Sequence, residues 1–260
     1  MQALRTAATG MSAQQLNVEV ISNNIANMNT VGFKKQRAEF QDLLYHTLER
    51  AGAMAAEGAI VPTGVQIGGG VKAGSVYRIT EQGAVTQTGN PYDLAISGRG
   101  FFQVLMPTGE TAYTRAGNLS LNADGQLVTE DGYAIQPAIA VPGDATSISI
   151  SKSGEVQAIR EGQAEAEVVG QIELANFVNE AGLSAIGDNL LVETAASGPA
   201  VIGAPGTVGF GNLLQGYTEA SNVDAVSEIT ALIVAQRAYE MNSKVISAAD
   251  EMLQAANAVK

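Results

Sequence analysis

Each end of this chain carries a narrow apolar stripe with heptad spacing, and this feature limits the possible folds more than any other. Near the N-terminus, a heptad whose first a position is residue 4 is apolar at seven of its eight a and d positions, and Gln14 is the exception. A strict a/d stripe is narrower than that of an ordinary surface helix and is typical of a coiled-coil seam. The spacing predicts a helix over residues 1–28. We expect it to stop near Asn27 and Gly32, because Asn and Gly tolerate the left-handed conformation that ends helices.

The C-terminal stretch repeats the pattern. A heptad whose first a position is residue 232 is again apolar at seven of eight positions, with Asn242 as the exception, and the other three d positions are alanine. The spacing predicts a helix over residues 223–259, with Ser221 or Asn222 as its N-cap. The small residues at d would let a second helix approach closely.

Two apolar stripes need a partner each, and the simplest solution is that they pack against one another as a two-stranded coiled coil. Two separate surface helices on a globular core are the alternative. Gln14 and Asn242 are either buried amides that fix the register or hydrated positions of the seam. We expect the assembly interface to use Leu4, Met11, Val18, Ile21, Ile25, Leu232, Tyr239, Ile246 and Leu253.

The middle of the chain has a different pattern, in which short alternating runs are separated by turn signals. The dipeptides Asp124-Gly125 and Asp131-Gly132 suit tight hairpin turns that require a positive φ. The sequence therefore predicts an α+β fold, with the N- and C-terminal helices forming a coiled coil and a mainly antiparallel β domain inserted between them. The expected domains are residues 1–32 with 220–260, an extended connector at 33–75, and a β-rich domain at 76–219.

The connector has two parts with different expectations. Residues 36–50 are expected to form a short helix through Phe40, Leu43, Leu44 and Leu48. Residues 51–75 are rich in Ala and Gly and include Pro62, Gly68, Gly69 and Gly70, which is typical of an extended connector.

Charge and composition exclude several classes of function. The formal net charge is −12, and residues 51–219 hold seventeen acidic and six basic residues, so no basic patch for nucleic acid is expected. The chain has no cysteine, which excludes disulfides, zinc–thiolate sites and thiol nucleophiles. The N-terminal stretch lacks the apolar core of a secretory signal peptide, and no apolar run approaches the about 18 residues of a membrane span.

Residues that could perform catalysis are scarce. His46 is the only histidine, and neither a cysteine nor a G-x-S-x-G motif accompanies it. The triplet at 68–70 is not followed by the Lys-Ser/Thr of a phosphate-binding loop. We therefore expect no catalytic, cofactor-binding or metal site and no enzyme activity. The many carboxylates leave open a secreted β-rich carbohydrate-active enzyme or adhesin as a more distant alternative.

Both chain ends carry extended motifs. The stretch SNNIANMNTVGFKKQRAEFQDLL at residues 22–44 resembles the N-terminal motif of bacterial flagellar rod and hook proteins, and QGYTEASNVDAVSEITALIVAQRAYEMNSKVISAADEML at 215–253 resembles their C-terminal motif. In the middle, PTGVQIGGGV, NPYDLAISGRGFFQV and YTRAGNLSLNADGQLVTEDGYAIQP resemble the distal rod members of this family. The resemblance covers essentially the whole chain.

The resemblance implies a structural subunit of the flagellar distal rod, a rigid hollow helical drive shaft that carries torque from motor to hook. A proximal rod or hook subunit is the alternative within the family. The implied partners are copies of the chain itself, other rod subunits, hook protein, the peptidoglycan and outer-membrane ring proteins, and the flagellar type III export apparatus. The implied location is the basal body, from periplasm to outer membrane, after export without a cleaved signal. In this family a longer segment at residues 45–75 is associated with a stiff rod, and a passive linker is the alternative for it.

Overall fold

The chain folds into two compact units in the computed structural model, which describes residues 2–49, 54–56, 59–60, 63–160 and 166–258. The terminal unit contains Met1–Ala26, Gln36–Tyr77 and Asp224–Lys260, and the β unit contains Asn27–Lys35 and Arg78–Val223. All strand pairs with a described register are antiparallel. The α+β class with a mainly antiparallel middle is thus confirmed.

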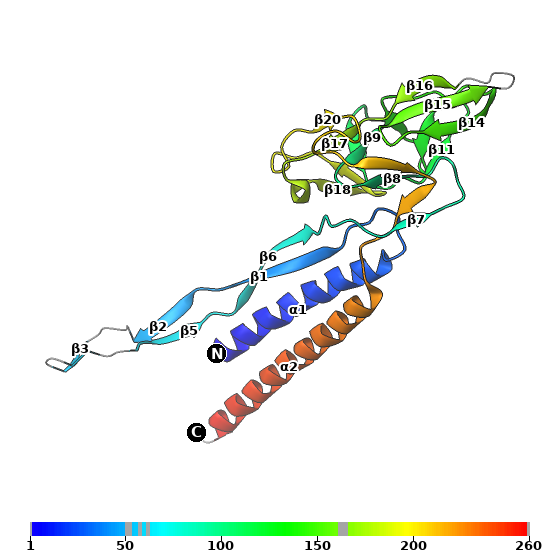
Figure 1. Cartoon of the computed structure of the whole chain (residues 1–260). Helices are drawn as coiled ribbons and strands as arrows, with labels where there is room; N and C mark the ends of the chain where they lie inside the picture. The colour runs from blue at the N-terminus through cyan, green and yellow to red at the C-terminus, as the bar shows by residue number, and fades with distance from the viewer. Residues whose placement is uncertain (1, 50–53, 57–58, 61–62, 161–165, 259–260) are drawn as a thin grey trace. The chain divides into compact units, whose positions relative to one another are not determined.

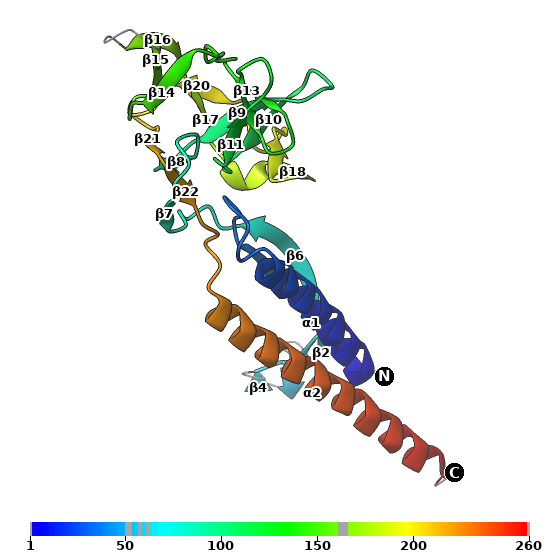
Figure 2. The same cartoon turned by 90° about the vertical axis from the view of Figure 1, so that its right-hand side faces the viewer.

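Two long helices make up most of the terminal unit. They are α1, Gln2–Ala26, and α2, Ala225–Ala258. Figures 1 and 2 both show them side by side. The helices predicted over 1–28 and 223–259 are confirmed to within a few residues. After α1 the Thr30 N–H donates to the Asn27 carbonyl, and Gly32 has a φ of +70°, so the Asn/Gly stretch does end the helix.

Beside the helices runs a long two-stranded ribbon, which continues into a narrower arm. The ribbon is β1, Gln36–Asp42, paired with β6, Val71–Arg78. The arm is β2, Tyr45–Glu49, paired with β5, Val65–Gly68. Beyond it, β3, Met54–Ala56, pairs with β4, Ala59–Ile60.

The short helix expected over residues 36–50 is wrong, because this segment forms β1 and β2. The leucines of this segment have helix-like spacing, but the burial of Gln36, Ala38 and Phe40 alternates with the exposure of Arg37 and Glu39. Pairing with β6 and β5, which are far away in sequence, therefore decides the structure over the local spacing.

The β unit is built on a nine-stranded antiparallel sheet, ordered β11-β12-β13-β9-β10-β19-β18, in which β17 also pairs with β9 and β20 pairs with β17. A three-stranded sheet, β14-β15-β16, and the pairs β21–β8 and β22–β7 complete it. The strands are β7 Val85–Gln87, β8 Leu94–Ser97, β9 Phe101–Leu105, β10 Thr111–Thr114, β11 Leu119–Leu121, β12 Leu127–Thr129, β13 Ala134–Gln136, β14 Ala145–Ile150, β15 Glu155–Arg160, β16 Glu167–Gln171, β17 Leu174–Asn176, β18 Ser184–Gly187, β19 Leu190–Val192, β20 Val201–Gly203, β21 Asn212–Gln215 and β22 Tyr217–Glu219, and a short 3-10 helix covers Glu180–Gly182.

The hairpin turns follow the dipeptides that predict them. Gly125 lies between β11 and β12 with a φ of +75°, and Gly132 lies between β12 and β13 with a φ of +85°. Both Asp-Gly turns are confirmed. The turns bring together one main core, whose fully buried members include Leu94, Ile96, Phe102, Ile135, Val156, Ile172 and Leu174.

Removing the ring of Phe102, which has no exposed surface, should destabilise the β unit. The substitution Phe102→Ala leaves a cavity and loses apolar contacts, so we expect the free energy of unfolding to fall by about 3–5 kcal/mol. Urea denaturation followed by circular dichroism measures this change. Val208 is fully exposed, and Val208→Ala should stay within about 0.5 kcal/mol of the parent chain. Equal effects of the two substitutions would contradict this account of the core.

Candidate assembly site

The end of α1 is held by a buried asparagine. Asn24 is only 1% exposed, and its side chain makes three hydrogen bonds. Its Oδ1 accepts from the Gln36 N–H at 2.8 Å, and its Nδ2 donates to the Gln36 carbonyl at 2.8 Å and to Glu228 Oε2 at 3.0 Å. We call Asn24, Gln36 and Glu228 the terminal anchor. Because an unpaired buried amide is costly, these bonds specify how α1, β1 and α2 meet.

The first turn of α2 is capped by Asp224. Its Oδ2 accepts a hydrogen bond from the Ser227 N–H at 3.1 Å, which is the usual N-cap contact. The expectation that Ser221 or Asn222 caps this helix is therefore wrong, since the helix begins only at Ala225. Asn222 serves a different contact, described below.

The β unit contains a buried cluster of three charged side chains. Glu219 is 1% exposed and lies at the end of β22. Its Oε1 is 2.5 Å from Lys34 Nζ, and its Oε2 is 2.6 Å from Arg115 Nε. The Gly83 N–H also donates to Oε1 at 2.9 Å. The three charged residues come from the segment after α1, the strand before α2 and the middle of the chain.

Two cations share one carboxylate, so the surplus positive charge needs further acceptors. Arg115 Nη1 donates to the Gly100 carbonyl at 2.5 Å, and Nη2 donates to the carbonyls of Ile96 and Gly98 at 3.0 and 2.5 Å. Lys34 Nζ also donates to the Glu81 carbonyl at 2.8 Å. Buried charges are tolerated only when paired and hydrogen-bonded, and this cluster meets both conditions.

The electrostatics of the cluster shift two pKa values. Burial by itself raises the pKa of Glu219, but the charges of Arg115 and Lys34 and their hydrogen bonds outweigh it, so the pKa lies below the ordinary value of 4.5. Burial lowers the pKa of Lys34, and the contact with Glu219 offsets only part of that effect. Glu219 is therefore held as a carboxylate at neutral pH.

Backbone contacts extend the cluster. The Lys35 N–H donates to Asn222 Oδ1 at 2.7 Å, and Asn222 Nδ2 donates to the carbonyls of Ile79 and Glu81, each at 3.0 Å. The Gly32 N–H donates to the Glu219 carbonyl at 2.8 Å. A Cβ on Gly32 would lie 2.7 Å from Ala116 N, so only glycine fits there.

We call Lys34, Arg115, Glu219 and Asn222 the β anchor. The chain passes between the two units four times, at residues 26–27, 35–36, 77–78 and 223–224. Each crossing is within two residues of a hydrogen bond made by one of the two anchors.

The residues expected to form the assembly interface all lie on α1 or α2. Ile21 is buried, Tyr239 and Leu253 are exposed, and the others are half-buried: Leu4, Met11, Val18, Ile25, Leu232 and Ile246. Asn242, the polar exception in the second stripe, lies against Gly10 of α1, where an added Cβ would be 2.9 Å from its Nδ2. Glycine in a helix is unfavourable, and here it makes room for that amide.

The expected connector residues lie where the ribbon meets the arm. Gly68 ends β5, the Gly69 N–H donates to the Leu44 carbonyl at 3.1 Å, and the Gly70 carbonyl accepts from the Leu43 N–H at 2.8 Å. Gly70 has a φ of +117°, and a Cβ there would overlap Thr9 Oγ1. Pro62 lies outside the described residues.

Among the described residues no cluster of His, Cys, Asp or Glu could hold a metal ion. In the same part of the chain no helix is long and apolar enough to cross a membrane. Neither anchor is predicted by the spacing of apolar residues, because the anchor residues are polar. One sequence signal could have indicated the anchors. It is a polar residue within a long motif that does not occupy an a or d position of the heptad, such as Asn24.

Three family models, all of flagellar rod or hook proteins, each match one part of the chain. They are described as flagella basal body rod protein at residues 4–34, flagellar hook protein FlgE/F/G D1 domain at 95–158, and flagellar basal body rod FlgEFG protein C-terminal at 214–259. The flagellar basal-body rod protein FlgG of Caulobacter vibrioides is 72% identical over 100% of both chains. This chain belongs to the flagellar basal-body rod protein family. FlgG of Agrobacterium fabrum is 54% identical over 97% of each chain, whereas FlgF of Caulobacter vibrioides is 35% identical over 92% of this chain and 89% of its own.

Membership of this family confirms the expected role of the chain. The protein is a structural subunit of the flagellar basal-body rod with a distal rod role, and it is not an enzyme. The carbohydrate-active alternative is thereby excluded. Except for Gln36, the anchor residues fall in the matched stretches: Asn24 and Lys34 in the first, Arg115 in the second, and Glu219, Asn222 and Glu228 in the third.

Neutralising Glu219 should test the β anchor. Glu219→Gln leaves Lys34 and Arg115 without a buried counter-charge, so we expect the free energy of unfolding at neutral pH to fall by about 3–5 kcal/mol. Because the folded-state pKa of Glu219 is lowered, its stabilisation is present above the unfolded value of 4.5 and is lost as the pH falls through the folded-state value. The variant should therefore lose less stability on acidification than the parent chain.

Urea denaturation over a pH series measures both effects. The matched control is Glu81→Gln, because Glu81 is exposed and contributes only its backbone carbonyl to the cluster. A Glu219→Gln chain as stable as this control would show that the cluster does not hold the β unit together.

Proposed function

We propose that this chain polymerises into the distal rod, a rigid hollow helical drive shaft that transmits torque from the flagellar motor to the hook. The observation that carries the proposal is a second apolar face on α2. One face of this helix, with Ala235 and Ala249 buried, packs within the terminal unit. The rest of the helix surface is exposed and displays Val226, Ile229, Ile233, Val234, Met241, Val245 and Met252.

Part of the exposed apolar surface lies on the opposite side of the helix from Ala235 and Ala249. At about 100° per residue, Val226, Ile229 and Ile233 point roughly 120–180° away from these two alanines, whereas Val234, Met241 and Val245 point roughly 40–120° away. A helix that is apolar on two sides needs contacts on both. An apolar surface of this extent marks an interaction site, and further copies of the terminal helices are partners of suitable chemistry. In a closed tube each copy supplies such a surface to its neighbours.

We further propose that the seam between α1 and α2 is a heptad coiled coil. Buried Ile21 and half-buried Ile246 lie at expected seam positions of the two helices. The contact of Asn242 with Gly10 supports the idea that this amide fixes the register. On this view residues 1–32 with 220–260 form the inner tube, residues 33–75 are the connector, and 76–219 form the outer wall.

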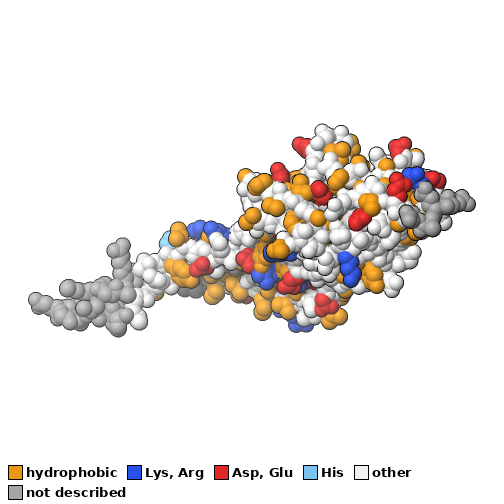
Figure 3. Space-filling model, turned by 45° about the horizontal axis from the view of Figure 1, so that its top comes forward, with side chains coloured by type: hydrophobic (Ala, Val, Ile, Leu, Met, Phe, Trp, Pro, Cys, Tyr) orange, Lys and Arg blue, Asp and Glu red, His pale blue; other side chains and the backbone are white. Residues whose placement is uncertain are grey.

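The charge of the β unit suits an outer wall that turns within other structures. The unit contains sixteen acidic and seven basic residues. Figure 3 shows acidic side chains spread over the face that it displays. Single-sign charge keeps surfaces apart and limits apolar adhesion, which favours low-friction rotation. The proposed partners are other rod subunits and hook protein, the peptidoglycan and outer-membrane ring proteins, and the flagellar type III export apparatus.

The location proposed with this role runs from the periplasm to the outer membrane within the basal body. A proximal rod or hook subunit is the alternative role. The higher identity to FlgG than to FlgF from the same organism favours the distal rod. A straight, stiff polymer in electron micrographs would support this choice, and a curved one would favour a hook subunit.

A charge in the proposed seam should block assembly. Ile246→Asp places a carboxylate among apolar side chains, where its desolvation is unfavourable, so we expect no polymer from this variant. Sedimentation and negative-stain electron microscopy measure the polymer. Ile246→Leu, which keeps the apolar character, is the matched control and should assemble. Polymers of normal yield from the Asp variant would refute a packed seam.

Shortening residues 51–75 should make the rod more flexible, if the connector and arm stiffen it. Removing part of this segment takes away contacts that would join neighbouring subunits, so we expect a shorter persistence length in electron micrographs. A chain in which the same segment is shuffled at constant length separates the effect of sequence from that of length. Unchanged bending in the shortened chain would identify the segment as a passive linker.

A further inference from the structure

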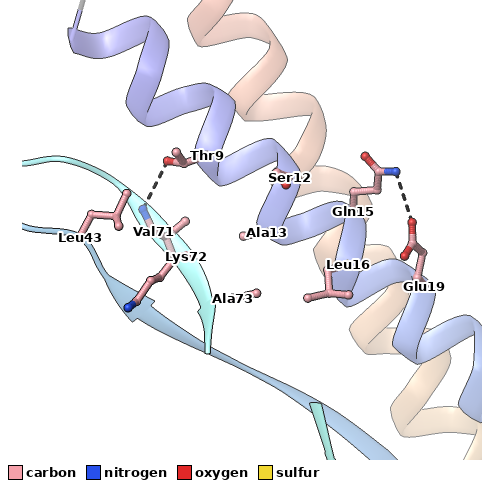
Figure 4. A pocket seen from close by; sticks show the side chains of 10 residues that line it. All are labelled: Thr9, Ser12, Ala13, Gln15, Leu16, Glu19, Leu43, Val71, Lys72 and Ala73. Carbon is pink, nitrogen blue, oxygen red and sulfur yellow. Dashed lines mark hydrogen bonds between the residues drawn. The ribbon is translucent and has the colours of Figure 1, made fainter. Parts of the chain in front are cut away.

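The hollow between α1 and the ribbon has its polar groups accounted for within the chain. Figure 4 shows that the Thr9 hydroxyl accepts a hydrogen bond from the Val71 N–H at 3.3 Å, and that Gln15 Nε2 donates to Glu19 Oε1 at 3.2 Å. Among the described residues that line this hollow, no polar side chain is both buried and without a partner. Nothing in its walls therefore requires a ligand.

A different hollow lies in the β unit, where the turn between β9 and β10 meets β18 and β19. Its volume is about 520 Å³, within the range of about 300–1,000 Å³ that is typical of small-molecule sites. Its apolar walls are the side chains of Met106, Ile186 and Val192. Thr111 also lines it, and its hydroxyl already donates to Gln136 Oε1 at 3.4 Å.

Tyr113 is the buried polar residue of this hollow. It is 5% exposed, and its ring packs edge-on against Phe177 with the ring centroids 4.8 Å apart. Its hydroxyl makes no hydrogen bond to another described residue, yet it is not enclosed in the core. Because the core covers the ring, the hydroxyl is the end that Tyr113 presents to the hollow. A buried side chain with a free hydroxyl needs a partner from outside the chain.

The hollow also carries negative charge, from Glu110 and Glu193. Burial raises the pKa of the Tyr113 hydroxyl and the charge of Glu193 raises it further, so the hydroxyl stays protonated at neutral pH. The Ala200 N–H donates to Glu193 Oε2 at 3.4 Å. Within the described part of the chain neither carboxylate forms an ion pair, and neither Lys nor Arg lines the hollow. Its charge is therefore left for a cationic ligand.

The residue types narrow the chemistry of that ligand. Carboxylates repel anions, and a hard metal ion needs six or more oxygen ligands, which walls that are largely apolar do not supply. An ammonium group has three N–H donors, which suit a carboxylate and a hydroxyl oxygen together. A short aliphatic chain attached to it would cover the apolar walls. A primary amine thus matches both kinds of surface.

We infer that this hollow binds a small aliphatic primary amine in its ammonium form. The ammonium lies between the Glu193 carboxylate and the Tyr113 hydroxyl. The aliphatic chain lies on Met106, Ile186 and Val192. All of these residues belong to the β unit of one copy, so the inference goes beyond the proposed function and does not depend on polymerisation.

Methionine-methyl NMR tests the inference on the full chain before it polymerises, because Met106 lines the hollow. Hexylammonium is added at neutral pH to chain with isotope-labelled methionine methyl groups, and the Met106 signal is identified by its loss in Met106→Leu. We expect a saturable shift of this signal and none of Met28 or Met241, which lie elsewhere. Butylammonium, which is two methylenes shorter, should bind more weakly by up to about fourfold per methylene.

Two substitutions test the polar contacts. Glu193→Gln removes one charge at an exposed position and should weaken hexylammonium binding about two- to fivefold. Tyr113→Phe keeps the ring, removes the hydroxyl and should weaken binding by about as much. Asp124→Asn makes the same charge change at an exposed residue between β11 and β12, and as the matched control it should leave the dissociation constant unchanged. If Tyr113→Phe does not fold, the comparison of the two carboxylate variants decides.

The choice of probe separates the possible ligands. Butyltrimethylammonium keeps the charge but has no N–H donor, so it should bind more weakly than butylammonium. Nα-acetyl-lysine amide carries the same butylammonium on a peptide. Tighter binding of the free amine supports a small-molecule ligand, and tighter binding of the lysine derivative overturns it in favour of a protein side chain. Absence of a Met106 shift with hexylammonium, or equal binding by Glu193→Gln and Asp124→Asn, overturns the site and leaves polymerisation unaffected.

Discussion

The structure depends on one buried carboxylate. Glu219 accepts hydrogen bonds from Lys34, Arg115 and the Gly83 backbone, and it is almost fully withdrawn from water. Without it the β unit would bury two cations with no counter-charge, a state that proteins avoid. Around it are gathered the segment that follows α1, the strand that precedes α2 and the centre of the chain. In the terminal unit Asn24 has a comparable part, because its amide bonds both the Gln36 backbone and the Glu228 carboxylate and so joins α1, β1 and α2.

Much of the fold could be predicted from the sequence because its signals are local and repeated. The heptad stripes place both helices, and Asp-Gly dipeptides place two hairpin turns, since each signal rests on a conformational preference of a few neighbouring residues. Residues 36–50 could not be predicted in the same way. Phe40, Leu43, Leu44 and Leu48 have helix-like spacing, and only the pairing of their segment with β6 and β5, later in the sequence, makes it extended.

The candidate site also contains residues that have a local sequence signal and residues that have none. The burial of Ile21 on α1 could be predicted from spacing, because the heptad stripe places this side chain on the apolar face of its helix. The anchors could not, because Lys34 and Glu219 are ordinary charged residues until the fold removes them from water. No local sequence pattern predicts that Lys34 will be buried, because its partner Glu219 lies near the other end of the chain. Resemblance to a family marks such positions as part of a motif, but only the three-dimensional contacts give the reason.

The separation of these partners in sequence has a consequence for the order of folding. Lys34 and Glu219 are 185 residues apart, and Asn24 and Glu228 are 204 apart. Contacts of such long range carry the largest loop-closure cost and form late. A chain that emerges with its N-terminus first can pair its hairpins early, but it cannot complete the β anchor before Asn222 has appeared, or the terminal anchor before Glu228 has appeared. The subunit is thus completed only by the arrival of its own C-terminal end.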